Sequence, residues 1–172
     1  FVPADDLVVP YTATSLEDAD AIIHTIKISE NELRKQQVGG FYRDIELNPA
    51  YVNESETDKK ERELDGTRKG KDEKMYSLLE CHVNLDIDGF NDVNAEGEPT
   101  GIKLPYIVTI EEASKEVLSI RRNYEIGDVT KSKISYFVHF KFLPGLGFYG
   151  FGLIHMIGGL SRTATSALRS LL

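Results

Sequence analysis

In the sequence MYSLLECHVNLDI, Met75–Ile87, apolar and polar residues begin to alternate, which makes this segment the clearest signal for the fold. In its second half the apolar residues fall two positions apart, so they share one face of an extended strand: Cys81, Val83, Leu85 and Ile87. A period of two is typical of a sheet that is packed on one face and solvated on the other.

Three more runs of this kind follow, over residues 102–110, 117–123 and 134–142. The segments between them are short and contain turn formers such as Gly127-Asp128. Successive strands with short connections pair antiparallel. Residues 75–142 are therefore predicted to form a four-stranded antiparallel meander.

A strand and a short helix are predicted before this sheet. The β-branched run Ala21–Ile28 indicates the strand. Directly after it, Ser29-Glu30-Asn31-Glu32 matches a capping box, in which the serine and the second glutamate satisfy each other's free backbone N–H groups. The helix is expected to end near Val38, before two glycines.

Residues 48–74 are predicted to be a charged insertion or linker, because they contain few large apolar side chains. Glu and Lys at pairing distances favour an exposed helix over residues 54–64, and a mobile linker is the alternative. The basic patch from Arg68 to Lys74 is a candidate contact for nucleic acid or an acidic partner. The acidic residues around it largely cancel its field, which favours a solvated surface.

The run KFLPGLGFYGFG, Lys141–Gly152, is rich in glycine and aromatic residues. Proline fixes φ, glycine allows positive φ and aromatics anchor a chain into a core, so we expect a shaped loop rather than a flexible one. Beyond the loop, apolar residues at spacings of three and four predict a helix over residues 153–172: Leu160, Ala164, Ala167, Leu168 and Leu171.

These elements predict an α+β fold in four parts. Residues 1–47 hold the first strand and helix, residues 48–74 are the insertion, residues 75–152 are the β region with its loop, and residues 153–172 begin a helix. The last helix has no glycine cap or polar tail to finish it. We therefore expect the chain to be an internal piece of a longer protein.

Composition narrows the possible functions. The chain has 172 residues, of which 41% are hydrophobic, enough for one compact core. Its 20 basic and 28 acidic residues give a net charge of −8, which argues against a protein that grips phosphate backbones. The lack of a long apolar run predicts a soluble protein, and a single cysteine predicts a fold that needs no disulfide.

Two short motifs imitate ligand sites. Gly145–Gly150 fits the bare G-x-G-x-x-G spacing of nucleotide-binding loops, but it follows an antiparallel meander and carries bulky aromatics where a nucleotide would approach. Asp92–Gly97 resembles the first half of a calcium loop, but the twelfth position is Lys103 instead of a glutamate. A structural loop and a turn-rich hairpin are the favoured interpretations.

Other polar residues offer little for catalysis. Cys81 with His82 or His139 is a conceivable nucleophile pair, yet no third group is evident to orient it, and an inert buried thiol is favoured. Arg121-Arg122 ends a strand and suits either an anion or partner contact or, more simply, solvated edge charges. We therefore predict no catalytic, cofactor-binding or metal-binding residues.

Residues 76–172 resemble the portal proteins of short-tailed double-stranded DNA bacteriophages. The resemblance rests on KLPYIVTI at 103–110, VLSIRRNY at 117–124, and above all FLPGLGFYGFG at 142–152 with Gly158-Gly159-Leu160 behind it. It is looser before this region, through Val9-Pro10-Tyr11 and the helix at 29–40.

The resemblance implies a structural, non-enzymatic subunit in a ring of twelve at one capsid vertex, through which DNA is packaged and ejected. This piece corresponds to the wing, which contacts neighbouring subunits and coat or scaffolding protein. Terminase and tail proteins would bind regions outside this chain, and DNA would pass without sequence-specific binding. No membrane contact or cofactor is implied, and the location is the virion, assembled in the host cytoplasm.

Two other classes of function stay open at this point. The meander fits a self-contained tail-associated or adhesion module, and Cys81 with a histidine fits a cysteine-dependent hydrolase. The portal interpretation accounts for more of the chain, because it rests on residues spread over the last hundred positions.

Overall fold

The computed structural model describes residues 1–47, 60, 63–64, 66, 75–145 and 147–171. The chain forms two compact units. The first contains Phe1–Val9 and Ala21–Ile134, and the second contains Pro10–Asp20 and Ser135–Leu172. The insertion predicted at 48–74, with its candidate helix at 54–64 and its Arg68–Lys74 patch, lies almost entirely outside the described residues.

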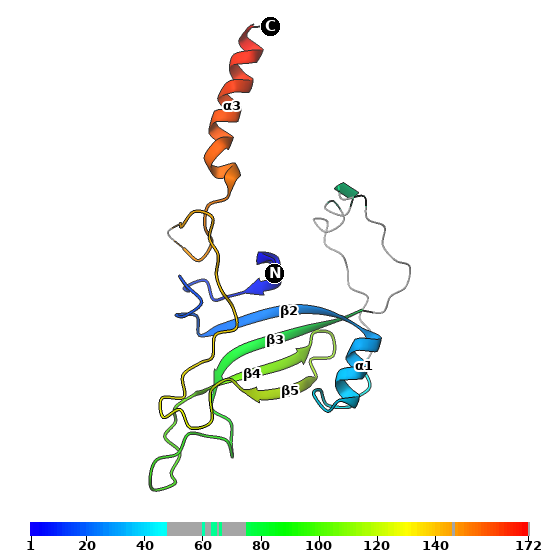
Figure 1. Ribbon diagram of the computed structural model, residues 1–172, viewed down its shortest axis with the longest axis vertical. Helices are drawn as coiled ribbons and strands as arrows, with labels where there is room; N and C mark the ends of the chain where they lie inside the picture. The colour runs from blue at the N-terminus through cyan, green and yellow to red at the C-terminus, as the bar shows by residue number, and fades with distance from the viewer. Residues whose placement is uncertain (48–59, 61–62, 65, 67–74, 146, 172) are drawn as a thin grey trace. The chain divides into compact units, whose positions relative to one another are not determined.

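The first unit is built on a five-stranded antiparallel sheet in which each strand pairs with the next along the chain (Figure 1). After a short 3₁₀ turn at Ala4–Asp6, the strands are β1 (Leu7–Val8), β2 (Ala21–Ser29), β3 (Met75–Leu85), β4 (Leu104–Glu111) and β5 (Val117–Arg122). β3 pairs with β2 along nine residues and with β4 along eight, so it lies at the centre.

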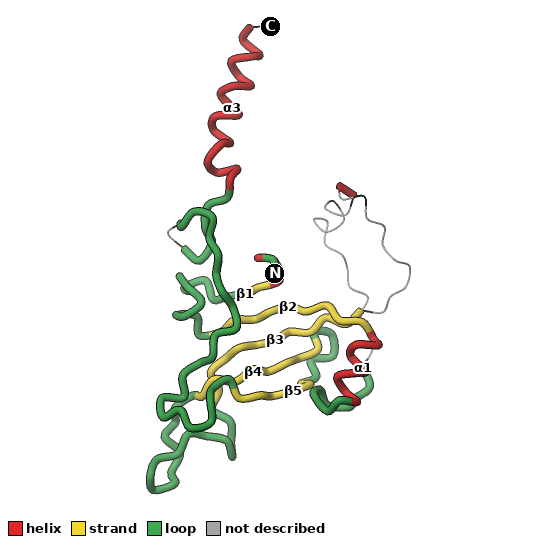
Figure 2. Tube along the Cα trace, viewed as in Figure 1, coloured by secondary structure: helices red, strands yellow, loops and turns green. Residues whose placement is uncertain are grey.

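The predicted α+β class is confirmed, and so are the strands read from residues 75–87, 102–110 and 117–123. The prediction of a fourth meander strand at 134–142 is wrong. In the described chain, residues 134–142 belong to no strand, and Figure 2 draws them as loop. β2 and the short β1 extend the sheet on its other side instead.

The chain leaves the sheet after β5 because of a proline. Asn123 lies opposite Pro105 of β4 and donates its N–H to the Pro105 carbonyl at 3.0 Å. Pro105 has no N–H to return. The carbonyl of Asn123 instead accepts the N–H of Ile134 at 3.0 Å, so a loop of ten residues closes at this point.

Helix α1 (Glu30–Val38) follows β2 directly and packs against the sheet near the start of β3 (Figure 1). Half of the predicted capping box forms: the Ser29 hydroxyl accepts the N–H of Glu32 at 3.3 Å. The Glu32 carboxylate meets Lys35 and Gln36, both at 3.4 Å. The helix buries one leucine in the main apolar core, formed by Leu33, Tyr42, Leu47, Tyr76, Leu78 and Leu118.

The second unit ends in helix α3 (Leu153–Leu171), which confirms the predicted C-terminal helix. Of the loop aromatics expected to anchor the chain, only Phe148 is buried, whereas Phe142, Tyr149 and Phe151 are exposed. The loop is nevertheless closed by a backbone contact. Leu143 and Phe151 form an isolated antiparallel bridge, with the Phe151 N–H donating to the Leu143 carbonyl at 2.9 Å. A Cβ added at Gly150 would overlap that carbonyl oxygen, so the bridge requires glycine there.

Candidate functional site

The most concentrated polar chemistry of the first unit lies on one face of the sheet, around Glu80 of β3. Its Oε1 is 3.0 Å from His82 Nε2, and its Oε2 is 3.4 Å from Arg121 Nη2 on β5. The strand register places His24 of β2 opposite Glu80. Side chains two apart on a strand share a face, which is why Glu80 and His82 meet although a residue separates them.

The neighbours of Glu80 stabilise its charged form. The hydrogen bond from His82 lowers the pKa of Glu80 most, and partial burial works against it. The charges of His82, Arg121 and His24 lower this pKa further. A general base is most effective with a pKa near the working pH, so this carboxylate is a poor proton acceptor and a good ion-pair partner.

Arg121 is held from two sides. Besides Glu80, its guanidinium lies over the ring of Phe41, 4.4 Å from the centroid, an arrangement that stabilises the cation. Its Nε is buried and has no hydrogen-bond partner among the described residues. Of the predicted Arg121-Arg122 edge pair, Arg121 therefore ties strands together, whereas Arg122 is exposed.

The Glu80, His82 and Arg121 cluster was not recognised in the sequence. The spacing of Glu80 and His82 signals only a shared face, and Arg121 lies 41 residues away on a different strand. The cluster couples β3 to β5. At its centre lies the Glu80 carboxylate, which is ionised and paired with His82 and Arg121. That arrangement suits the stabilisation of a sheet.

Cys81 lies on the opposite face of β3. It packs beside the second apolar cluster, which contains Leu104, Tyr106 and Val108. Burial raises the pKa of its thiol, and the charge of Glu80 raises it further. The thiolate is the nucleophilic form, so a raised pKa makes Cys81 less reactive. His82 points to the other face, to Glu80, and His139 stacks on Phe148 with ring centroids 4.2 Å apart.

The segment that imitates a calcium loop forms a closed hairpin, bridged between Val93 and Pro99. The Asp92 carboxylate pairs with Lys131 and accepts the Thr100 hydroxyl at 2.7 Å. Asn94 Oδ1 accepts the N–H groups of Glu96 and Glu98, both at 2.9 Å. The candidate ligands are thus used by the turn itself. Among the described residues, no group of three His, Cys, Asp or Glu is placed to hold a metal ion.

The glycine-rich loop is closed by its own side chains. Lys141 Nζ donates to the carbonyls of Gly147 at 3.1 Å and Thr14 at 3.3 Å. His139 stacks on the buried Phe148, and burial lowers the pKa of His139. Lys141 is therefore engaged with backbone carbonyls of the same unit, which favours the structural interpretation of the loop.

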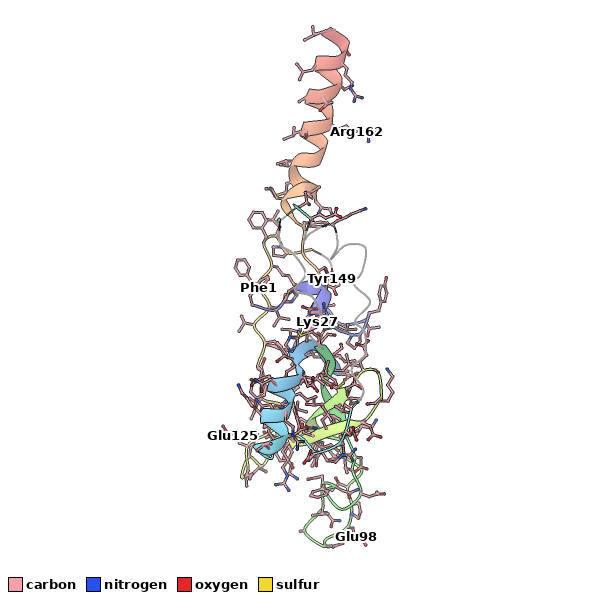
Figure 3. The ribbon with its side chains drawn as sticks, turned by 90° about the vertical axis from the view of Figure 1, so that its right-hand side faces the viewer. Phe1, Lys27, Glu98, Glu125, Tyr149 and Arg162 are labelled. Carbon is pink, nitrogen blue, oxygen red and sulfur yellow. The ribbon has the colours of Figure 1, made fainter. Side chains whose placement is uncertain are left out.

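Helix α3 exposes apolar residues along its length, and Figure 3 shows its side chains, Arg162 among them, projecting from the helix. None of its described residues is buried. The exposed large apolar residues continue from the loop into the helix: Phe142, Tyr149, Phe151, Leu153, Ile154, Met156, Ile157, Leu160, Leu168 and Leu171. Within the described chain, no helix is long and apolar enough to cross a membrane. Exposed apolar patches are a common feature of contact surfaces in proteins.

Neither the known protein-family models nor the curated proteins include a match to this chain.

Proposed function

We propose that this chain is a wing segment of a phage portal protein, a structural subunit in a ring at one capsid vertex. The resemblance of residues 76–172 to portal proteins supports this function. The observation that carries it is the exposed apolar surface of α3 and its preceding loop. Burial of this apolar surface against other subunits would stabilise an assembly of copies by about 25 cal/mol per Å² buried.

The charge chemistry of the first unit agrees with a structural role. Glu80, Arg121 and Asp92 are each engaged by neighbouring side chains, so their charges hold strands and turns together. In the proposed ring of twelve, this segment contacts neighbouring subunits and coat or scaffolding protein, while terminase and tail proteins bind other regions. The net charge of −8 keeps passing DNA from adhering to the subunit.

The test is to image the product of the complete gene by electron microscopy and to weigh it by native mass spectrometry. We expect closed rings with a central channel. The variant Leu160→Asp places a charge on the exposed apolar stripe of α3 and should prevent ring formation. Ser161→Asp adds the same charge at the adjacent exposed position and should still form rings.

Monomers or small closed oligomers without a channel under all assembly conditions would contradict the proposal and favour a tail-associated or adhesion module. Equal assembly of the Leu160→Asp and Ser161→Asp proteins would show that the apolar stripe of α3 is not the contact surface.

A further inference from the structure

The side chains of residues 138–142 alternate as in a strand, but the backbone of this segment is not paired with another strand. The side chains of Val138 and Phe140 are 96% and 88% exposed, and Phe142 follows at 63%. Between them, His139 and Lys141 turn to the other side, toward Phe148 and the Gly147 carbonyl. Among the described residues, the backbone of 138–142 makes no backbone hydrogen bond. One apolar face and a row of peptide groups are thus available for pairing.

The outer edge of β5 offers unpaired backbone groups to which such a strand could bind. The bond from the Asn123 N–H to the Pro105 carbonyl shows that Asn123 faces β4. Because successive peptide groups alternate in direction, Ile120 and Arg122 direct their N–H and C=O groups away from β4. The Leu118 carbonyl, on the same edge, accepts the Arg43 N–H at 2.8 Å. Ile120 and Arg122 have no such partner in the described chain, and the Ile120 side chain is 53% exposed.

The same end of β5 contains a polar group that lacks partners. The side chain of Asn123 is fully buried, and neither its Nδ2 nor its Oδ1 has a hydrogen-bond partner among the described residues. Burial of an unpaired polar group costs about 1–3 kcal/mol.

The distribution of charge favours contact between unlike parts of two copies. Residues 129–172 contain five Lys and Arg and no Asp or Glu. Residues 1–128 contain the other 15 basic residues and all 28 acidic ones. Two acidic parts repel each other, whereas the basic segment of one copy is attracted to residues 1–128 of another. This attraction comes from residues 1–128 as a whole, because β5 itself carries Arg121 and Arg122.

We propose that residues 138–142 of one copy add as an antiparallel strand to the outer edge of β5 in a second copy. The main-chain groups of 138–142 pair with those of Ile120 and Arg122, and the apolar face of Val138 and Phe140 covers Ile120. Addition of a strand to an exposed edge is a common mode of recognition. Each copy then donates through one surface and receives through another, a head-to-tail contact that forms a ring when the rotation between copies closes. The inference rests on the proposed function only for ring closure.

The experiment uses the full chain in a Cys81→Ala background, which removes the only native thiol. One protein carries Ile120→Cys with a purification tag that changes its size, and the other carries Val138→Cys. The two are mixed and treated with a short bis-maleimide cross-linker. In this mixture a bond between the two kinds of chain can form only between copies.

Val129→Cys replaces Val138→Cys in the matched control. Val129 is the same residue type, is 95% exposed, and lies outside the proposed strand. Because a docked strand raises the local concentration of its thiol to about the millimolar range, we expect at least about tenfold more mixed dimer with Val138→Cys than with Val129→Cys. Circular dichroism checks that all variants fold alike.

Similar yields for the two valine variants would overturn the inference. So would cross-links confined to a single chain when both cysteines are placed in it, because the segment would then pair with its own β5. If rings assemble but Val138 and Ile120 do not cross-link, this contact is wrong and the portal function stands. If they cross-link but no ring forms, the contact stands and the portal function is wrong.

Discussion

At Glu80, one carboxylate is shared by His82 of the same strand and Arg121 of β5. The side chain of Glu80 is 21% exposed, so water competes only weakly for its oxygens. Removal of one partner from such a group leaves the others unsatisfied, which costs more than the loss of a surface ion pair. The cluster therefore predicts a measurable contribution to the stability of the sheet.

We predict that Glu80→Gln lowers the free energy of unfolding by about 1–3 kcal/mol at neutral pH, measured by urea denaturation. The pKa of Glu80 is lowered in the folded protein, so its stabilisation is complete above the ordinary glutamate value of 4.5. It is lost as the pH falls through the lower folded value. The difference between the wild-type and Glu80→Gln proteins should therefore shrink in acid.

Glu116→Gln is the matched control, because Glu116 pairs with Arg43 at the surface, where both side chains are more than half exposed. Its cost should be at most about 1 kcal/mol. An equal cost for the two variants would show that the partial burial of Glu80 has no energetic consequence.

Gly150 predicts a second effect at the scale of one residue. In Gly150→Ala, the new Cβ would overlap the Leu143 carbonyl, so the bridge between Leu143 and Phe151 must open. We expect amide exchange of Phe151 to accelerate by about tenfold or more, which corresponds to about 1.4 kcal/mol of lost local stability.

Gly147→Ala in the same loop should leave this exchange rate unchanged, because a Cβ at Gly147 would meet no atom within 4 Å. If both glycine variants accelerate the exchange of Phe151, the effect is a general loosening of the loop, and the close approach at Gly150 is not its cause.

Sequence reasoning identified which residues could react but not what they contact. The Cys81 and His82 pair was disfavoured because no third group was evident to orient it, and the structure places the two side chains on opposite faces of β3, as neighbours on a strand must be. The contact of Glu80 with Arg121 could not be predicted, because it depends on the register of β3 against β4 and of β4 against β5. Register is a property of the assembled sheet, whereas alternation is a property of each strand.

At the scale of elements, the start of α1 depends on one side chain. Ser29→Ala removes the oxygen that accepts the Glu32 N–H, and we predict a loss of about 1 kcal/mol in the free energy of unfolding. Ser29→Asp restores an acceptor and should recover most of this loss in the same urea titration. Equal stability of the alanine and aspartate variants would show that the cap contributes nothing.

The elements also show when an alternating sequence pattern is enough to predict a strand. The alternating second half of β3 is paired with β4, in a register of eight residue pairs, so pattern and pairing agree there. Residues 134–142 alternate equally well, yet they have no strand beside them. Alternation reports which side chains share a face. It does not report whether a neighbouring strand is present, and that was the error in the predicted meander.

At the scale of the whole molecule, the separation of charge is the dominant feature. All 28 acidic residues precede Val129, whereas residues 129–172 carry only positive charges. The net charge of −8 conceals this separation. A chain with this distribution should associate with other copies most strongly at low ionic strength, because screening shortens the range of charge attraction to about 10 Å at 0.1 M salt.

We predict that Arg162→Glu weakens association between copies and that added salt reduces the difference from the wild-type protein, both measured by sedimentation velocity. Lys103→Glu makes the same change in charge at an exposed residue of the acidic part and should not weaken association. If both variants weaken association equally, net charge alone is responsible and the separation of charge is irrelevant.

Pro105 has a further consequence for how this sheet could be redesigned. Because it cannot donate, the opposite carbonyl of Asn123 is free to accept the N–H of Ile134. A substitution such as Pro105→Ala would supply the missing donor and compete for that carbonyl. The closure of the loop between Asn123 and Ile134 therefore depends on one absent hydrogen atom, and a single codon change at Pro105 would test it.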